Sequence, residues 1–242
     1  GKRTFLHPTT FTFGIYDQEI APYYGAPQSL YSDEFTFKHG VDGPMGYKLE
    51  IMPMHPGLTT ALMGGFGDNA REEVERLPNL ASSIALMRDG FHEQSVGGTV
   101  ELRDNGEPIL DYPMNDYLLD GARRTHLTMA EMQFAAGAKM VRPSHSHASY
   151  YSSWKDAKAA IEGFTYDPVI TGVGSAHVMG GCTMGEDETR SVVNSDGSYK
   201  HLNGLYVIDG SVFPTSLGVN PQLTIYGMSA RNASTLASKL KA

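Results

Sequence analysis

The sequence predicts an α+β fold, with an antiparallel sheet and its helices over residues 1–165 and a Gly-rich segment, one strand and a terminal helix over residues 166–242. Three observations support this prediction. Short segments alternate apolar and polar residues, as strands with one buried face do. Longer segments repeat apolar residues at helical spacing. From Gly172 the chain becomes rich in glycine, and we expect this change of composition, rather than a linker, to mark the boundary between two domains.

The composition excludes several classes of protein. Of 242 residues, 40% are hydrophobic, and the formal net charge is −8. The apolar content suffices for a buried core, and the acidic balance argues against binding to nucleic acid or an anionic membrane surface. A single cysteine, Cys182, excludes an internal disulfide and a multi-thiolate metal site. No transmembrane run or secretion signal is visible, so we expect a soluble protein whose compartment stays open, with the cytoplasm as one candidate.

The first third of the chain predicts strands and loops. Residues 9–15 (TTFTFGI) alternate Thr with apolar residues, and residues 46–52 alternate apolar residues with Lys48 and Glu50. A further β-rich run covers residues 28–37. The loop before it contains residues that favour turns, Pro22, Gly25 and Pro27.

Helical patterns begin at Asn69, which with Glu72 resembles a capping box. After Pro78 the apolar spacing predicts a second helix over residues 80–87. A long helix is expected over residues 115–136. The remaining expected elements are a hairpin of strands 98–102 and 108–112 joined through Asp104-Asn-Gly106, a short strand at 139–142 and a helix at 153–161.

The end of the chain predicts a buried strand and a helix. Residues 205–208 form a continuous apolar run, followed by Asp209-Gly-Ser211. Asn220 is a favoured N-cap residue and Pro221 a favoured first helical residue, so a helix beginning there would direct backbone N–H groups and its positive dipole end at an anion. The apolar face expected to be buried in this helix comprises Tyr226, Ala230, Ala233, Leu236 and Leu240.

Motifs in this last part resemble the C-terminal signature of the glucose–methanol–choline (GMC) flavoprotein oxidoreductases. They are residues 177–185 (HVMGGCTMG), 192–194 (VVN), 204–215 (GLYVIDGSVFPT) and 220–224 (NPQLT). The match is ordered and spans residues 172–242. Residues 5–8 (FLHP), 26–29 (APQS) and 54–57 (MHPG) look most similar to the long-chain alcohol oxidase branch of that family.

The resemblance implies an FAD-dependent enzyme that oxidises an alcohol to a carbonyl by hydride transfer to flavin N5. It assigns His177 as the catalytic base, which suits an imidazole because its ordinary pKa lies near neutral pH. Asn220 would be its active-site partner. If Asn220 instead caps its own helix, its side chain is less free to reach the substrate, and these two roles stay alternatives. The residues implied to lie along FAD are Asp209, Gly210, Pro221, Gln222, Leu223 and Thr224.

The same resemblance implies a division of the chain. Residues 1–165 would form a substrate-binding domain of antiparallel sheet and helices, with an alcohol, apolar in character, as the expected substrate. Residues 166–242 would be a flavin-facing segment that supplies the last strand and helix of an α/β FAD-binding domain. The family's Gly-x-Gly-x-x-Gly loop does not occur here, so we expect the N-terminal FAD-binding portion on a preceding part of the protein or on a companion chain. Alone, this chain should expose apolar surface and be inactive.

Several of these residues also have simpler interpretations. A histidine taken singly is more often structural than catalytic, and the pair His145 and His147 lacks the further ligands that a metal site needs, so no metal is expected. Cys182 is expected to be a small packing residue. No Gly-x-Ser-x-Gly elbow supports a hydrolase. The alternative function is a flavin-free binding or scaffold module that retains the substrate-domain fold.

Overall fold

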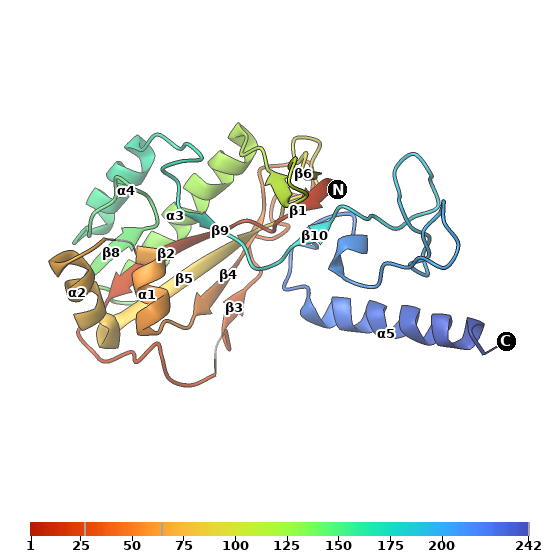
Figure 1. Cartoon of the computed structure of the whole chain (residues 1–242). Helices are drawn as coiled ribbons and strands as arrows, with labels where there is room; N and C mark the ends of the chain where they lie inside the picture. Colours follow the sequence, from red (N-terminus) through yellow and green to blue (C-terminus); the bar gives the residue numbers. More distant parts are fainter. Residues whose placement is uncertain (27, 64, 242) are drawn as a thin grey trace.

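The computed structural model of the chain describes residues 1–26, 28–63 and 65–241 (Figure 1). Its class is α+β, as predicted, and Pro27, which the sequence assigned to a loop, lies outside the described residues. The strands are β1 (Lys2–Phe5), β2 (Thr9–Ile15), β3 (Tyr31–Ser32), β4 (Tyr47–Met52), β5 (Leu80–Met87), β6 (Gly98–Leu102), β7 (Pro108–Asp111), β8 (Met140–Pro143), β9 (Val173–Gly174) and β10 (Met179–Gly180). The helices are α1 (Pro56–Met63), α2 (Asp68–Glu75), α3 (Asp116–Ala135), α4 (Trp154–Gly163) and α5 (Gln222–Lys239), with 3-10 turns η1 (Leu77–Asn79) and η2 (Gly210–Val212).

Two antiparallel sheets organise the chain. The larger has the strand order β3-β4-β5-β2-β8, with β9 paired to β2, and the smaller has the order β10-β1-β6-β7. The connection from β1 to β2 is short, so it ties the two sheets together. The small sheet also brings the first residues of the chain against β10, which follows the predicted catalytic segment, because Thr4 pairs with Gly180.

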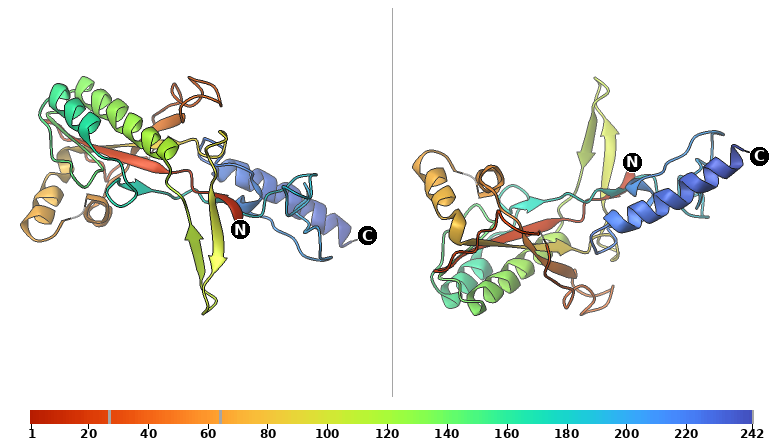
Figure 2. Two further views of the ribbon diagram at one scale, coloured as in Figure 1. Left: turned by 90° about the horizontal axis from the view of Figure 1, so that it is seen from above. Right: turned by 90° about the horizontal axis from the view of Figure 1, so that it is seen from below.

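Helices cover both faces of the larger sheet. In Figures 1 and 2, α3 and α4 lie on one side of it and α1 and α2 on the other. One core cluster joins the sheet to α3 through Met87, Leu118 and Met129. A second cluster, on the opposite face, joins Phe13 of β2 to Met63 of α1. The sheet is therefore a middle layer whose central strands, β2 and β5, are almost completely buried.

Local signals predicted many elements correctly. β2 has the predicted bounds, and β4, the β6–β7 hairpin, β8 and α4 lie where expected. α3 is capped by Asn115, whose side chain accepts a hydrogen bond from the Leu118 N–H. It is followed by Gly137 at φ 98°, a left-handed conformation that terminates helices and favours glycine.

Three predictions in this part were wrong. Residues 80–87 form strand β5 and not a helix, because β2 and β4 pair along its two edges. Its two faces are buried against α3 on one side and α1 on the other, which removes the alternation that marks a strand. Residues 28–37 contain only the two-residue strand β3. Helix α2 begins at Asp68 after Gly67, with no side-chain cap, so Asn69 lies within the helix and is not its cap.

The C-terminal segment, residues 175–241, differs from the rest. Figure 1 shows it as long loops above α5, to one side of the sheet body. Residues 205–208 do not form the predicted strand; Tyr206 makes one isolated bridge with Ser198, since no described strand lies beside this run. The predicted apolar face of α5 is also not buried, and Asn232 is the one fully buried residue of that helix. Among the described residues, no helix combines the length and apolar character needed to cross a membrane.

Candidate functional site

His177 lies between β9 and β10 and contacts a second histidine. Its Nδ1 atom is 3.0 Å from Nδ1 of His7, and the two rings stack with centroids 5.2 Å apart. His7 lies between β1 and β2, is fully buried and has φ 51°, which is unusual for a residue other than glycine. Ser175 fixes the approach of the two segments, since its hydroxyl donates to the Leu6 carbonyl. The segment that contains His177 is fixed at both ends, because β9 pairs with β2 and β10 pairs with β1. This pairing holds the two rings together.

The protonation states of this pair follow from burial. Burial, together with the charges of His177 and Lys48, lowers the pKa of His7 to about 3, so His7 is neutral near pH 7. The pKa of half-buried His177 is also lowered, chiefly by burial and further by Lys48, while the carboxylate of Glu50 opposes the shift. Both imidazoles are therefore uncharged at neutral pH, and His177 has a nitrogen able to accept a proton.

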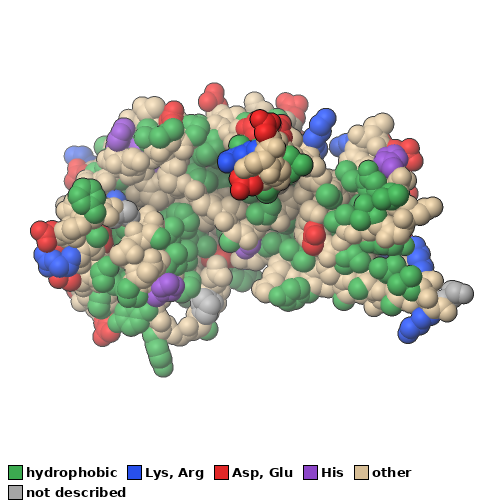
Figure 3. Space-filling view, in the orientation of Figure 1, with side chains coloured by type: hydrophobic (Ala, Val, Ile, Leu, Met, Phe, Trp, Pro, Cys, Tyr) green, Lys and Arg blue, Asp and Glu red, His purple; other side chains and the backbone are tan. Residues whose placement is uncertain are grey.

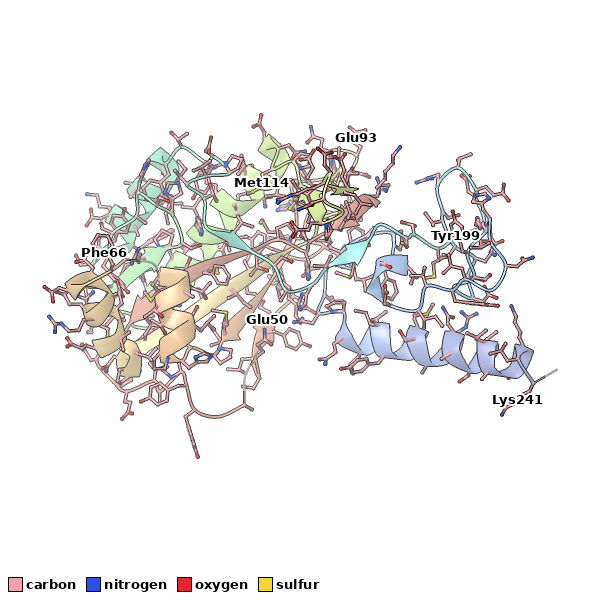
Figure 4. All side chains as sticks on the ribbon, in the orientation of Figure 1. Glu50, Phe66, Glu93, Met114, Tyr199 and Lys241 are labelled. Carbon is pink, nitrogen blue, oxygen red and sulfur yellow. The ribbon has the colours of Figure 1, made fainter. Side chains whose placement is uncertain are left out.

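Asn220 precedes α5 and contacts a pair of charged residues on β4. Lys48 Nζ donates to Asn220 Oδ1 at 2.8 Å, and Asn220 Nδ2 donates to Glu50 Oε2 at 3.2 Å. The two charges also pair with each other, with Lys48 Nζ 2.9 Å from Glu50 Oε1. Lys48 and Glu50 lie two positions apart on β4, so their side chains share one face of the strand. Figure 4 shows Glu50 between the larger sheet and the first turn of α5.

Asn220 is not the cap of α5, which corrects the expectation from its sequence position. The cap position is occupied by Pro221, and no side chain caps the first turn. Pro221 still supports the helix, because its carbonyl accepts from the Ile225 N–H at 2.8 Å. The side chain of Asn220 therefore bonds to β4 and not to its own helix.

The other residues predicted to lie along FAD flank this start of α5. Asp209 accepts from the Ser211 N–H at 2.8 Å and caps η2. Gly210 is buried, and a Cβ atom there would come within 3.0 Å of Ile225 Cδ1, so glycine permits η2 to pack on α5. The segment after His177 lies against η2, since Cys182 N donates to the Ser211 carbonyl at 3.0 Å. The remaining predicted residues of the first turn, Gln222, Leu223 and Thr224, are exposed.

The structure thus connects His177 and Asn220 through residues that the sequence did not single out as site residues. Glu50 is only 3% exposed, although the alternation around it suggested a polar outer face, and Ile51, on the expected apolar face, is 40% exposed. His7 belonged to a motif but had no predicted role. The spacing of Lys48 and Glu50 on a short strand was the available signal; their contact with a residue 170 positions later was not visible in the sequence.

Exposed apolar side chains surround this region. Leu223 is 83% and Tyr226 59% exposed near the start of α5, and Val178, next to His177, is 58% exposed. Figure 3 shows hydrophobic side chains along α5 on the visible face. Within the described ranges, no group of three or more His, Cys, Asp or Glu side chains is arranged to hold a metal ion.

Comparisons with known proteins agree with this architecture. A family model described as "GMC oxidoreductase" matches residues 94–229, which is more than half of the chain. An uncharacterized GMC-type oxidoreductase of Mycobacterium tuberculosis is 26% identical over 99% of this chain and 36% of its own length. A long-chain-alcohol oxidase of Arabidopsis thaliana is 26% identical over 93% of this chain and 32% of its own length. The chain thus spans about a third of the length of these curated relatives.

Solved structures give the same fold. An Aspergillus oryzae formate oxidase, determined in a study of FAD modification, has a TM-score of 0.64 at 14% identity, covering 100% of this chain and 48% of that chain. The fold and the family match agree with each other. The chain belongs to the GMC oxidoreductase family. Membership of this family supports FAD as the cofactor.

Proposed function

We propose that this chain supplies the substrate-side active site of an FAD-dependent enzyme that oxidises an alcohol to a carbonyl. The observation that carries the proposal is the neutral, half-buried His177 beside His7, joined through the electrostatics of Lys48 and Glu50 to Asn220. The long-chain-alcohol oxidase relative supports an alcohol as the substrate class. In this proposal residues 1–165 bind the alcohol, and residues 166–242 face the flavin.

The residues around the start of α5 fit a flavin. No side chain caps the first turn, so the N–H groups of Gln222, Leu223 and Thr224 and the positive end of the helix dipole are available to an electron-rich group. Asp209, Gly210 and Pro221 would complete the contacts. FAD, when bound, would accept the hydride from the carbinol carbon of the alcohol.

His177 would hold the proton that leaves the hydroxyl group. The Nδ1–H group of His177 can donate a hydrogen bond to Nδ1 of His7, and this tautomer leaves Nε2 of His177 free to accept a hydrogen bond and then the proton. His7 would remain neutral throughout, because burial strongly disfavours its cation. Asn220 would bind the substrate oxygen and hold it in register with His177.

The flavin-binding portion is proposed as a necessary partner, located on another part of the protein or on a companion chain. The curated relatives are about three times as long, and α5 exposes Leu223 and Tyr226. We therefore expect the 242-residue chain alone to bind little FAD and to be inactive. The absorbance near 450 nm of the purified chain tests this expectation, and a stoichiometric flavin spectrum without a companion polypeptide would refute it.

The catalytic assignment is tested in the flavin-loaded enzyme with a panel of primary alcohols of increasing chain length. Replacing a general base costs about 10²- to 10⁴-fold in rate, so His177→Ala should lose turnover by that order while retaining the wild-type circular dichroism spectrum. The exposed His147→Ala is the matched control and should retain turnover. A flavin-free scaffold would instead show no wild-type turnover and no flavin binding in the assembled protein.

The pH profile gives a second test of His177. Its pKa is lowered, so kcat/KM should rise with pH through an acid limb that lies below the ordinary histidine value of about 6.5. An acid limb above that value, or one that persists in His177→Gln, would remove His177 from the role of base.

A further inference from the structure

Lys48 and Glu50 contact both ends of one amide group, and this feature extends beyond a simple ion pair. Glu50 is 3% exposed, and the side chain of Lys48 is 13% exposed. A pair held this far from water gains little stability over apolar residues of similar volume. A contribution to stability therefore does not explain why Lys48 and Glu50 are charged. Their contacts indicate a role in positioning another group.

The lysine ammonium has three close partners. Lys48 Nζ donates to Glu50 Oε1 and to Asn220 Oδ1, and it lies 4.2 Å from the centroid of the Tyr31 ring. The carboxylate is equally engaged. Glu50 Oε2 accepts from Asn220 Nδ2 and, at 2.9 Å, from Gln28 Nε2.

The charges select one orientation of the Asn220 amide. Its carbonyl oxygen meets the cation and its NH₂ group meets the anion. Rotating the amide by half a turn would place NH₂ against an ammonium and a carbonyl oxygen against a carboxylate, so both hydrogen bonds would be lost at once. One N–H of Asn220 is used by Glu50, and the second N–H remains.

We propose that Lys48 and Glu50 are positioning residues that clamp the Asn220 amide, so that its second N–H donates to the oxygen of the substrate. This assignment rests on the proposed function and adds a detail to that function. The substrate oxygen accepts a hydrogen bond from Asn220, while the hydroxyl hydrogen is directed to His177. The clamp thus favours a hydroxyl group, whose oxygen can accept a hydrogen bond from Asn220 and whose hydrogen can be donated to His177.

The charged and titratable groups that act on His177 are His7, Lys48 and Glu50. Lys48 lowers the pKa of His177 and Glu50 raises it, so the pair also balances the charge at the histidine. Removing Glu50 alone should lower the His177 pKa. Removing both charges should move it less, since the two opposing effects disappear together.

A double-mutant cycle in the flavin-loaded enzyme tests the clamp. Misplacement of a positioning group by about 1 Å can cost on the order of 100-fold, so we expect Lys48→Met with Glu50→Met to lower kcat/KM by about the same factor as Asn220→Ala. Adding Asn220→Ala to the paired variant should then cost little more. An independent, full further loss from Asn220→Ala in that background would overturn the clamp.

A control pair of substitutions and NMR measurements complete the test of the clamp. Replacing the exposed pair Lys139 and Asp17, 3.1 Å apart, by methionine is the matched control and should leave kcat/KM unchanged. Histidine NMR titration of the flavin-loaded enzyme should show a lower His177 pKa in Glu50→Gln and a smaller change in the paired variant. The clamp itself is read from the Asn220 side-chain NH₂ signals, which should shift in the paired variant because both hydrogen-bond partners are removed. Unchanged signals there would refute the clamp, even if the wild type oxidises no alcohol and the proposed function has failed separately.

Discussion

The sheet body, residues 1–174, and the C-terminal segment, residues 175–241, bury their side chains in opposite ways. In the body, β2 and β5 are buried almost throughout and helices cover both sheet faces. In the C-terminal segment, α5 buries only Asn232 and exposes large apolar residues. The body therefore holds its own core, whereas the apolar surface of α5 is not covered within the described residues. The proposed flavin-binding portion would provide that cover.

Two leucines should separate the regions most strongly. Leu80 is 0% exposed in β5, and Leu223 is 83% exposed in α5. Leu80→Ala should lower the free energy of unfolding of the 242-residue chain by about 2–5 kcal/mol, because it removes buried contacts and leaves a cavity. Leu223→Ala should change it by less than about 0.5 kcal/mol. Urea unfolding followed by circular dichroism and Trp154 fluorescence measures both. Equal losses would mean that α5 has a buried face in solution.

The salt bridges of the two regions should differ in the same direction. In the body, Arg142 donates to Glu73 at 3.0 Å, and Tyr150 donates to the same carboxylate at 2.7 Å, with Glu73 11% exposed. Arg142→Met leaves that carboxylate uncompensated and should cost about 2–3 kcal/mol, less than for a fully buried pair. In the C-terminal segment, Lys239→Met breaks a pair between an exposed lysine and the partly exposed Asp196, and it should change the free energy of unfolding by less than about 1 kcal/mol. A similar loss in both variants would contradict the contrast.

The sequence predicted the body better where a signal was local. The alternation of residues 9–15 and the helical spacing of residues 115–136 each depend on neighbouring residues alone, and the structure has β2 and α3 there. Strand β5 was mistaken for a helix because its hydrogen-bond partners come from residues far away in the chain. Residues 205–208 were mistaken for a strand because an apolar run becomes a strand only beside another one.

In the candidate site, too, local signals were visible in the sequence and contacts between distant residues were not. The motifs indicated His177 and Asn220, but nothing in the sequence states that β4 approaches the residue before α5. Lys48 and Glu50 therefore looked like an ordinary polar strand face, and the stacking of His7 on His177 required the pairing of β1 with β10. The catalytic roles of His177 and Asn220 stay predictions.

Acidification should destabilise the body through its buried histidines. Burial lowers the pKa of His126, as of His7, to about 3. Below about pH 6.5 these two histidines bind protons in the unfolded chain but stay neutral in the folded chain. The free energy of unfolding therefore has its full value above that pH and falls as the pH drops toward 3. Each histidine contributes at most about 1.4 kcal/mol per pH unit. His126→Gln should reduce the slope between pH 6 and pH 4.5 in urea unfolding by about 1.4 kcal/mol per pH unit. An unchanged slope would show that His126 is protonated in the folded chain.

Two asparagines give the finest comparison, because each precedes a helix and only one caps it. The Asn115 side chain accepts from the Leu118 N–H at 3.2 Å, so Asn115→Ala should cost about 1 kcal/mol and speed amide exchange at Leu118. Asn220 instead bonds to Lys48 and Glu50 on β4. Asn220→Ala should therefore leave amide exchange in the first turn of α5 at its wild-type rate. Faster exchange there would mean that Asn220 caps its own helix in solution, and the amide would then be held by the helix and not by the charged pair.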